Sequence, residues 1–369
     1  MLMGEVALSE PYDIVVIGAG PAGSCAAQAA AQRGAKVLLI DRRQRIGIPV
    51  QCAEFVSRWI FRHASFSSTC ILQEVEKMVT HLPNRLTYEM KSPGYMLDRS
   101  LFDKELAASA VLAGARISIG TKAIGLSPEG LVVERGSKKE TISSKVFIGA
   151  DGASSSVARF LGQPSLKTIA ALQYEVVISE SLTQVDVYFH KDYEGGYAWF
   201  FPKGRTANVG VGVVSSKAPR LPDLLGNFLD FLRESKNLQG IQIVSTTGGL
   251  IPCESYQKNL FKNVLLIGDA AGHAHPITGA GILNAVIGGE IAGRIAAEAI
   301  EKADLRYLES FETEWREVFG KSLSYGGLKR EFLEKNWNKS EVDFEELIRK
   351  TWVGFKEYHQ GRRENPFVR

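Results

Sequence analysis

Short apolar runs alternate with helix-forming stretches at the start of the chain. Residues 14–17 form an apolar run that ends at Gly18, and an Ala-rich stretch of helical character covers 24–32. A second apolar run at 37–40 ends on Asp41. Buried runs of this length on either side of a helix predict a βαβ unit in a parallel sheet.

Two central segments predict a different kind of strand. Apolar and polar positions alternate with a period of two over 171–214, and 71–97 forms strands separated by turns. Such alternation is typical of antiparallel strands that bury one face. The pattern therefore predicts an α/β protein with a Rossmann-like, largely parallel unit and a second, mostly antiparallel sheet.

The C-terminal segment predicts two amphipathic helices. Large apolar residues recur at helical spacing over 305–319 and over 344–355. We expect these apolar faces to pack on the main body, and peripheral contact with a membrane is the alternative. The basic residues that could support such contact are Lys356, Arg362, Arg363 and Arg369.

The first glycine turn has the spacing of a dinucleotide site. Gly18, Gly20 and Gly23 form G-x-G-x-x-G between the first strand and its helix. These glycines allow a tight turn, close approach of a pyrophosphate and close helix packing. Asp41 is positioned to accept hydrogen bonds from an adenosine ribose. This motif alone does not distinguish FAD from NAD(P).

Residues inside and beside this turn complete the predicted nucleotide site. Pro21 and Ala22 lie within the motif, and Arg42 follows the acid. Arg42 contacts the adenine or a phosphate, or it belongs to a solvated loop. Asp151, in the turn after the strand at 141–148, lies near the cofactor or caps the next helix.

A second glycine turn follows the buried strand at 263–267. Gly268 and Asp269 end this strand, and a long helix begins near Gly279, Ala280 and Gly281. The free N–H groups of such a helix can bind a polar ligand edge, and an acid can hold a sugar-like hydroxyl. The two glycine turns therefore predict two half-sites for one long cofactor.

Composition limits the classes of function. The 369 residues carry a net charge of only +3, which gives no indication of nucleic-acid binding. The cysteines are far apart, so neither a zinc site nor a disulfide framework is predicted. We also expect no signal peptide and no membrane span, hence a cytoplasmic protein. The four cysteines are Cys25, Cys52, Cys70 and Cys253.

Three further features suggest chemistry. Cys52 follows a Pro-containing loop, where it has a functional role or is a small apolar residue. Arg99 begins a predicted helix, a position where a bound anion would offset the unfavourable dipole. Tyr197, Trp199 and Phe201 fall on one face of a strand, as core residues or as the wall of a ligand cavity.

Taken together, these motifs resemble the FAD-dependent oxidoreductases of the p-hydroxybenzoate hydroxylase fold. The shared motifs are the first glycine turn, GADG at 149–152 and GDAA at 268–271. PVQCAE at 49–54 and GYAWFFP at 196–202 are similar to two motifs of the geranylgeranyl reductase family within that fold. The departures are Ala53 and Ala280, where the family usually has Gly and Glu, and the histidines His273 and His275.

The resemblance implies roles for individual residues. The first glycines and Asp41 would hold the ADP half of FAD, and Asp269 its ribityl chain. Arg99 would face the cofactor, and the aromatic strand would line a cavity for an isoprenoid chain. The residues expected near the flavin ring are Cys52, Ala53, Gly279, Ala280, Gly281 and Ile282. The candidate catalytic residues are Cys52, Tyr197, Trp199 and His273.

The implied activity is reduction of carbon–carbon double bonds in a prenyl (geranylgeranyl-type) lipid. Only one G-x-G-x-x-G is present, so the electron donor would be transiently bound NAD(P)H, or ferredoxin. One alternative is an FAD-dependent monooxygenase of an aromatic or similar apolar substrate. Another is a flavin-containing prenyl-lipid binding protein without turnover.

The resemblance and the strand patterns suggest three regions. The FAD-binding domain is expected at 1–75, 94–170 and 253–300, and the substrate domain at 76–93 and 171–252. The helical C-terminal region is expected at 301–369.

Overall fold

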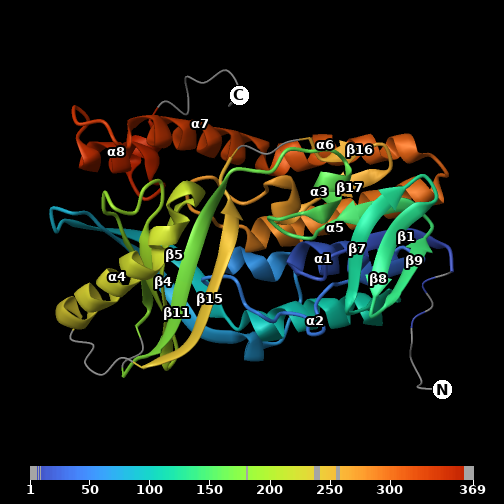
Figure 1. The fold of residues 1–369 in the computed structure, drawn as a ribbon, viewed down its shortest axis with the longest axis horizontal. Helices are drawn as coiled ribbons and strands as arrows, with labels where there is room; N and C mark the ends of the chain where they lie inside the picture. The colour runs from blue at the N-terminus through green and yellow to red at the C-terminus, as the bar shows by residue number, and fades with distance from the viewer. Residues whose placement is uncertain are drawn as a thin grey trace.

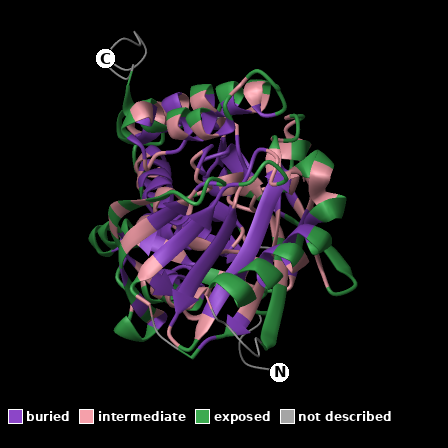
Figure 2. Ribbon diagram, turned by 90° about the vertical axis from the view of Figure 1, so that its left-hand side faces the viewer, coloured by how far each residue is buried: buried purple, intermediate pink, exposed green. Residues whose placement is uncertain are grey.

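The computed structural model describes residues 6, 8, 10–179, 182–236, 242–254 and 258–360. Two large sheets lie side by side along the long axis of the molecule (Figure 1). Helices and a small third sheet cover their outer faces, and the buried residues concentrate between these layers (Figure 2).

A six-stranded sheet contains the predicted βαβ unit. Its strand order is β16-β17-β10-β1-β2-β6, and all pairings are parallel except that of β16 with β17. The strands are β1 Tyr12–Ile17, β2 Val37–Ile40, β6 Arg116–Ser118, β10 Ser144–Gly149, β16 Leu260–Phe261 and β17 Val264–Leu266. Helix α1 (Pro21–Gln32) connects β1 to β2, which confirms the predicted unit.

Both faces of this sheet are covered, which explains the unbroken apolar runs at 14–17 and 37–40. Ile14 and Val16 pack toward α1 and α5 (Ile282–Glu301), whereas Val15 and Ile17 pack toward a three-stranded sheet. That small sheet consists of β7 Thr121–Ser127, β8 Gly130–Arg135 and β9 Lys138–Ile142. Helices α2 (Arg99–Leu112) and α3 (Ser156–Phe160) complete this half of the molecule.

The single strand predicted at 141–148 is wrong in one respect. The chain forms β9 up to Ile142 and then β10 from Ser144. The two strands pair with different sheets, since β9 pairs with β8 and β10 pairs with β1 and β17. The sequence pattern over these residues does not reveal such a change of partner.

The second large sheet has eight strands in the order β15-β11-β14-β13-β12-β4-β5-β3. Only β12 and β4 pair in parallel, so the predicted, mostly antiparallel sheet is confirmed. Its strands are β3 Phe55–Ser57, β4 Ile71–His81, β5 Thr87–Leu97, β11 Thr168–Val177, β12 Gln184–Tyr188, β13 Ala198–Lys203, β14 Thr206–Val214 and β15 Ile243–Pro252. Strands β4 and β5 each cross one of the predicted limits between the FAD-binding and substrate domains, near residues 75 and 94. The division into three regions stays a prediction.

Alternation along β13 divides its large side chains between two faces. Phe200 packs with α4 (Leu221–Ser235) on one side of the sheet. Trp199 and Phe201 pack on the other side, with Tyr197 against the same cluster. The predicted common face of Tyr197, Trp199 and Phe201 is confirmed, and it is directed toward the interior of the molecule.

The C-terminal helices pack on both halves, as predicted. Helix α6 (Ser310–Trp315) buries its aromatic residues against α5. Helices α7 (Lys321–Asn336), α8 (Phe344–Thr351) and α9 (Lys356–His359) lie along the upper edge in Figure 1. Residue 352 is extended, so the helix predicted through 355 ends at Thr351.

Helix α7 has no counterpart among the predicted elements. Its buried face includes two glycines and Arg330, so no regular apolar spacing marks it in the sequence. The basic residues Arg362, Arg363 and Arg369 lie outside the described residues. Short helices of other types occur at Arg58–Arg62, Ser68–Cys70, Ser215–Arg220, Gly268–Ala271, Leu305–Glu309 and Arg316–Gly320.

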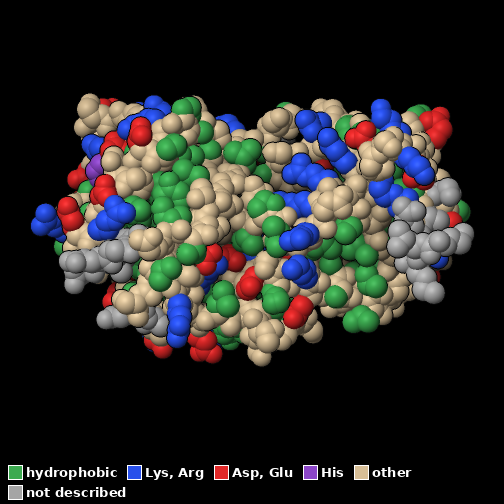
Figure 3. All heavy atoms as spheres, turned by 60° about the horizontal axis from the view of Figure 1, so that its bottom comes forward, with side chains coloured by type: hydrophobic (Ala, Val, Ile, Leu, Met, Phe, Trp, Pro, Cys, Tyr) green, Lys and Arg blue, Asp and Glu red, His purple; other side chains and the backbone are tan. Residues whose placement is uncertain are grey.

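The surface on the side of α2 carries interspersed basic, acidic and hydrophobic side chains. Figure 3 shows Lys and Arg side chains gathered to the right of the middle of this face. Across the described part of the chain, no helix has both the length and the apolar character needed to cross a bilayer.

Candidate active site

The turn after β1 is shaped for a ligand that approaches the backbone closely. Gly18 has a φ of +104°, and a methyl group there would lie 2.4 Å from the Ala150 carbonyl oxygen. A methyl group on Gly23 would lie 1.8 Å from the Gly18 carbonyl oxygen, so helix and turn need glycine at both positions. Gly20, in contrast, faces open space. This is the arrangement that a bound pyrophosphate requires.

Two helices begin at this site without a side-chain cap. Helix α1 starts after Gly20 and α5 after Gly281, and neither has an acid in its first turn. Helices α2, α3 and α8 each have a capping side chain, whereas α4, α6, α7 and α9 also lack one but begin away from the glycine turns. The open N–H groups of α1 and α5 are therefore available to phosphates or to polar edges of a ligand.

A small cavity of about 160 Å³ lies beyond the first glycine turn. Asp41 is in its lining and accepts hydrogen bonds from the backbone N–H groups of Ala19 (2.8 Å) and Arg43 (2.7 Å). Arg42 also lines this cavity. The space and the carboxylate fit the adenosine end of a dinucleotide.

Asp151 lines the same small cavity and also stabilises the start of α3. Its carboxylate accepts hydrogen bonds from the Ser155 hydroxyl (2.5 Å) and the Ser156 N–H (2.6 Å). Both alternatives considered for Asp151 from the sequence are thus compatible with its position.

A larger cavity of about 440 Å³ adjoins the small one, because Gly20, Ala150 and Gly152 line both. It runs between the six-stranded and the eight-stranded sheet. Many residues predicted from the sequence meet in its lining, although they come from distant parts of the chain. They are Gly20, Pro21, Ala22, Cys52, Ala53, Arg99, Tyr197, Trp199, Gly268, Asp269, Gly279, Ala280, Gly281 and Ile282.

The aromatic wall of this cavity is held by hydrogen bonds. The Tyr197 hydroxyl donates to the Thr278 carbonyl oxygen at 2.6 Å, which joins the residue just before β13 to the second glycine turn. The Trp199 indole donates to Gln173 Oε1 at 2.9 Å, and Gln173 Nε2 donates to the Cys52 carbonyl oxygen at 3.2 Å. These bonds orient the two rings beside the loop that carries Cys52.

Charged groups at the cavity have strongly altered acidity. Burial raises the pKa of Asp269 to about 6, and the Arg99 guanidinium partly opposes this. Burial disfavours the charged form of Arg99, but two hydrogen bonds to Asp103 (2.8 and 2.9 Å) raise its pKa above the ordinary value. Burial also raises the pKa values of Cys52 and Tyr197, so both side chains keep their protons at neutral pH.

His273 lies outside the lining of the cavity. Its Nδ1 accepts the Gly268 N–H at 3.2 Å, and its Nε2 lies 3.0 Å from Asn259 Oδ1. The ring stacks on Trp315 at 4.2 Å, and burial lowers its pKa to about 3. A neutral, fully engaged imidazole of this kind supports the turn after β17.

Several cavity residues were not singled out in the sequence. Gln173, Met78 and Met90 extend the lining along the eight-stranded sheet, and Trp352 and Val353 close it from the C-terminal segment. Gln173 interrupts an otherwise apolar alternation, which is a weak signal. No sequence pattern connects residue 352 with the glycine turns, since only the packed tail brings it there.

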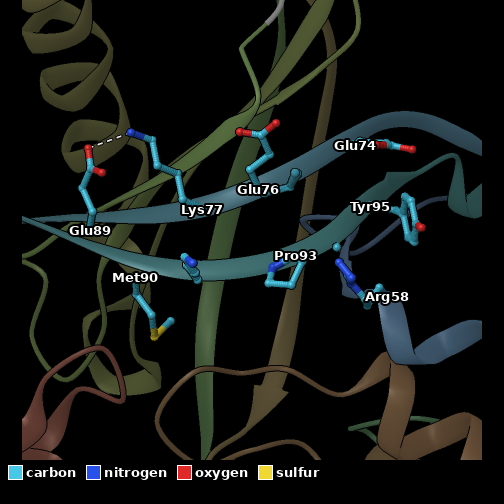
Figure 4. Close-up of a pocket in the computed structure, with 11 residues that line it drawn as sticks. Arg58, Glu74, Glu76, Lys77, Glu89, Met90, Pro93 and Tyr95 are labelled. Atoms are coloured by element: carbon cyan, nitrogen blue, oxygen red, sulfur yellow. Dashed lines mark hydrogen bonds and ion pairs between the residues drawn. The ribbon is translucent and has the colours of Figure 1, made fainter.

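A separate open groove of about 650 Å³ lies on the outside of β4 and β5. Figure 4 shows Glu89 and Lys77 paired on this side, at 2.7 Å, while Met90 points away from them. Met90 belongs to the linings of both the groove and the larger cavity. Within the described residues, no group of three or more His, Cys, Asp or Glu could hold a metal ion.

The cavities, the two glycine turns and the uncapped helices define an FAD-dependent oxidoreductase. Residues 13–159 match the family model described as FAD dependent oxidoreductase. Residues 168–251, which include the aromatic strand, match the geranylgeranyl reductase catalytic domain.

Proteins that are similar to this chain over most of its length belong to the same family. A digeranylgeranylglycerophospholipid reductase of Methanosarcina acetivorans is 37% identical over 86% of this chain and 83% of its own length. A second such reductase, from Methanococcoides burtonii, is 36% identical with the same coverage of both chains. The crystal structure of a geranylgeranyl bacteriochlorophyll reductase-like protein from Thermoplasma acidophilum has a TM-score of 0.85 at 29% identity, covering 94% of this chain and 92% of its own.

The chain therefore belongs to the geranylgeranyl reductase family of FAD-dependent oxidoreductases. The family resemblance, the enzymatic class and FAD as cofactor, all inferred from the motifs, are confirmed.

Proposed function

We propose that this enzyme reduces carbon–carbon double bonds in the isoprenoid chains of a prenyl lipid, of the kind named for its relatives. The shape and lining of the larger cavity carry the proposal. The cavity begins at the glycine turns and continues past Trp199 and Phe201 to Met78 and Met90. A long apolar substrate fits such a lining, because burial against aromatic and thioether side chains is its main source of affinity.

The chain's own residues have defined tasks in this proposal. When bound and reduced by the electron donor, the flavin would supply the hydride that adds to one carbon of the double bond. Trp199 and Phe201 exclude water and orient the chain. We assign the proton for the second carbon to Cys52, whose thiol is protonated and lines the cavity. Tyr197 is the second candidate, although its hydroxyl already donates to Thr278.

The same geometry suggests where each part of FAD would bind. The open space at Gly20 and the uncapped start of α1 suit the pyrophosphate. Asp41 and Arg42 lie at the adenosine end, and Asp269 lies beside Gly281 at the start of α5, where a ribityl hydroxyl could donate to it.

The reductant is proposed to be NAD(P)H or ferredoxin. Anaerobic mixing of the oxidised enzyme with NADPH, NADH or reduced ferredoxin distinguishes them, since only the competent donor bleaches the flavin absorbance rapidly.

A membrane-bound substrate places the enzyme at a membrane surface. We propose a cytoplasmic protein that binds membranes peripherally, a location with which four free cysteines agree. Sedimentation with liposomes that contain prenyl lipids tests the contact.

One experiment separates the proposed reductase from its rivals. The flavin is reduced anaerobically with dithionite and mixed with digeranylgeranylglycerophospholipid in detergent. Reoxidation of the flavin together with a product that has gained two hydrogens per bond supports the reductase. Oxygen incorporation on exposure to air would identify a monooxygenase, and bound lipid without any reoxidation would identify a binding protein.

A further inference from the structure

The loop that carries Cys52 is attached to the eight-stranded sheet at each of residues 51–54. Its position between the two large sheets brings it into the lining of the larger cavity. The sheet partners are the Gly248 carbonyl oxygen for Gln51 (2.6 Å), Gln173 for Cys52 (3.2 Å), and Asn208 for both Ala53 (3.2 Å) and Glu54 (2.9 Å). A loop with this many polar attachments is built to stay in one place.

Glu54 makes the strongest of these attachments. Its side chain is buried, and Lys203 Nζ lies 2.5 Å from its carboxylate, as a charge-assisted pair. Asn208 Nδ2 donates to the same oxygen, and the other oxygen accepts the Arg99 N–H at 3.0 Å. Lys203 and Asn208 belong to β13 and β14, whereas Arg99 begins α2. The carboxylate therefore joins both halves of the molecule.

The backbone of Glu54 is unusual as well. Its φ is +70°, in the left-handed region that a residue with a long side chain rarely adopts. In this conformation its N–H donates to Cys52 Sγ at 3.2 Å. Strained residues of this kind persist where the surroundings determine them fully, and they concentrate at functional sites.

We propose that Glu54 is a positioning residue of this active site: its carboxylate fixes the Glu54 backbone in place, and the Glu54 N–H in turn holds the Cys52 sulfur at the cavity wall. The role of Cys52 in reduction rests on the proposed function, but the placement of its sulfur by Glu54 does not.

The charges around Cys52 make the proposal measurable. Burial is the main reason why the pKa of its thiol is raised. The Arg99 guanidinium and the Glu54 N–H oppose this, whereas the carboxylates of Glu54 and Asp103 reinforce it. The Tyr197 phenol, immediately before β13, also interacts with the thiol. Loss of the Glu54 charge should therefore make Cys52 more acidic.

The test compares Glu54→Gln with Glu175→Gln. Glu175 is a matched control, because one of its carboxylate oxygens lies 3.4 Å from the same Lys203 ammonium while the other accepts a hydrogen bond from the Thr206 hydroxyl. Alkylation of Cys52 by iodoacetamide is followed in the FAD-loaded proteins across a pH series and assigned by peptide mass spectrometry.

We expect the alkylation profile of Glu54→Gln to move to lower pH and that of Glu175→Gln to stay with the parent. With a prenyl-lipid substrate, Glu54→Gln should lower kcat by roughly 10-fold with a smaller change in KM, since the sulfur is misplaced rather than the chain unbound. An unchanged profile in Glu54→Gln, or an equal shift in both variants, would overturn the proposal.

A second variant covers a failure of Glu54→Gln to fold, because that substitution leaves the buried Lys203 ammonium with only the more distant Glu175 carboxylate, at 3.4 Å, as its partner. Glu54→Gln with Lys203→Gln removes both charges and should give a smaller acid shift of the profile, because loss of the Lys203 ammonium offsets part of the loss of the carboxylate. If no variant and no parent protein reduces a prenyl lipid, the proposed function fails, and the alkylation profiles still decide the role of Glu54.

Discussion

Replacing Asp269 by asparagine should stabilise the FAD-free protein, and the gain should increase with pH. Burial raises the pKa of Asp269 from 3.8 to about 6. The folded state therefore prefers the protonated carboxyl more strongly than the unfolded chain does. Below about pH 4 both states are protonated and the full stability is present. As the pH rises through 6, the folded state must accommodate a poorly solvated charge, and stability is lost.

The size of this loss follows from the two pKa values. One pKa unit corresponds to about 1.4 kcal/mol, so a change from 3.8 to about 6 corresponds to about 3 kcal/mol at neutral pH. In the FAD-free protein, water can enter the cavity and solvate the Asp269 carboxylate, so about 3 kcal/mol is an upper limit for the loss of stability. Asparagine has no charge to accommodate and should avoid most of the loss.

Urea unfolding of the FAD-free proteins, followed by far-UV circular dichroism at several pH values between 4.5 and 8, measures the effect. The difference in unfolding free energy between Asp269→Asn and the parent should grow by about 2 kcal/mol over this range. FAD should bind the variant more weakly, because a charged acceptor for a ribityl hydroxyl is lost. A difference that is the same at every pH would refute the buried-charge explanation.

Three further predictions concern the turn, the cavity end and the proton donor. Gly20→Ala should fold normally and bind FAD at least about 10-fold more weakly, whereas Gly23→Ala should lose stability before FAD is added, as thermal unfolding with and without FAD would show. Trp352→Leu should shift the preference toward longer prenyl chains and lower the free energy of unfolding by about 3 kcal/mol. Replacing the buried Trp337 by leucine should lower only the free energy of unfolding. Cys52→Ser should slow double-bond reduction at least about 10-fold without slowing flavin reduction.

Each of these predictions has an outcome that contradicts it. Equal FAD affinity of Gly20→Ala and the parent would mean that no phosphate passes this residue. An unchanged chain-length preference in Trp352→Leu would show that the substrate ends elsewhere. Equal rates of double-bond reduction in single-turnover experiments would remove Cys52 from the reaction.

Much of the site was predictable because each half-site is local in the chain. Gly18, Gly20 and Gly23 lie within one turn, and their spacing has a direct steric meaning that the structure reproduces. The second glycine turn at Gly268 and the face shared by Tyr197 and Trp199 are equally local. Local spacing therefore predicted the nucleotide-binding unit, the aromatic wall and their meeting at one cofactor.

Long-range contacts were not predictable in this way. Glu54 was part of a recognised motif, but its pairing with Lys203 joins residues that are 149 positions apart. Trp352 reaches the cavity only because α7 and α8 pack against the eight-stranded sheet. His273 appeared to belong to the site because it is close to Asp269 in the chain, yet its ring turns into the core toward Trp315.

The sequence by itself determined the two glycine turns of a dinucleotide site, because their geometry follows from the spacing of neighbouring residues, and its further motifs indicated the family and, through the family, FAD. The tertiary structure alone decided which side chains line the larger cavity and how burial alters the charge of those that ionise. Those properties depend on burial and on contacts between distant strands, and the spacing of neighbouring residues predicts neither.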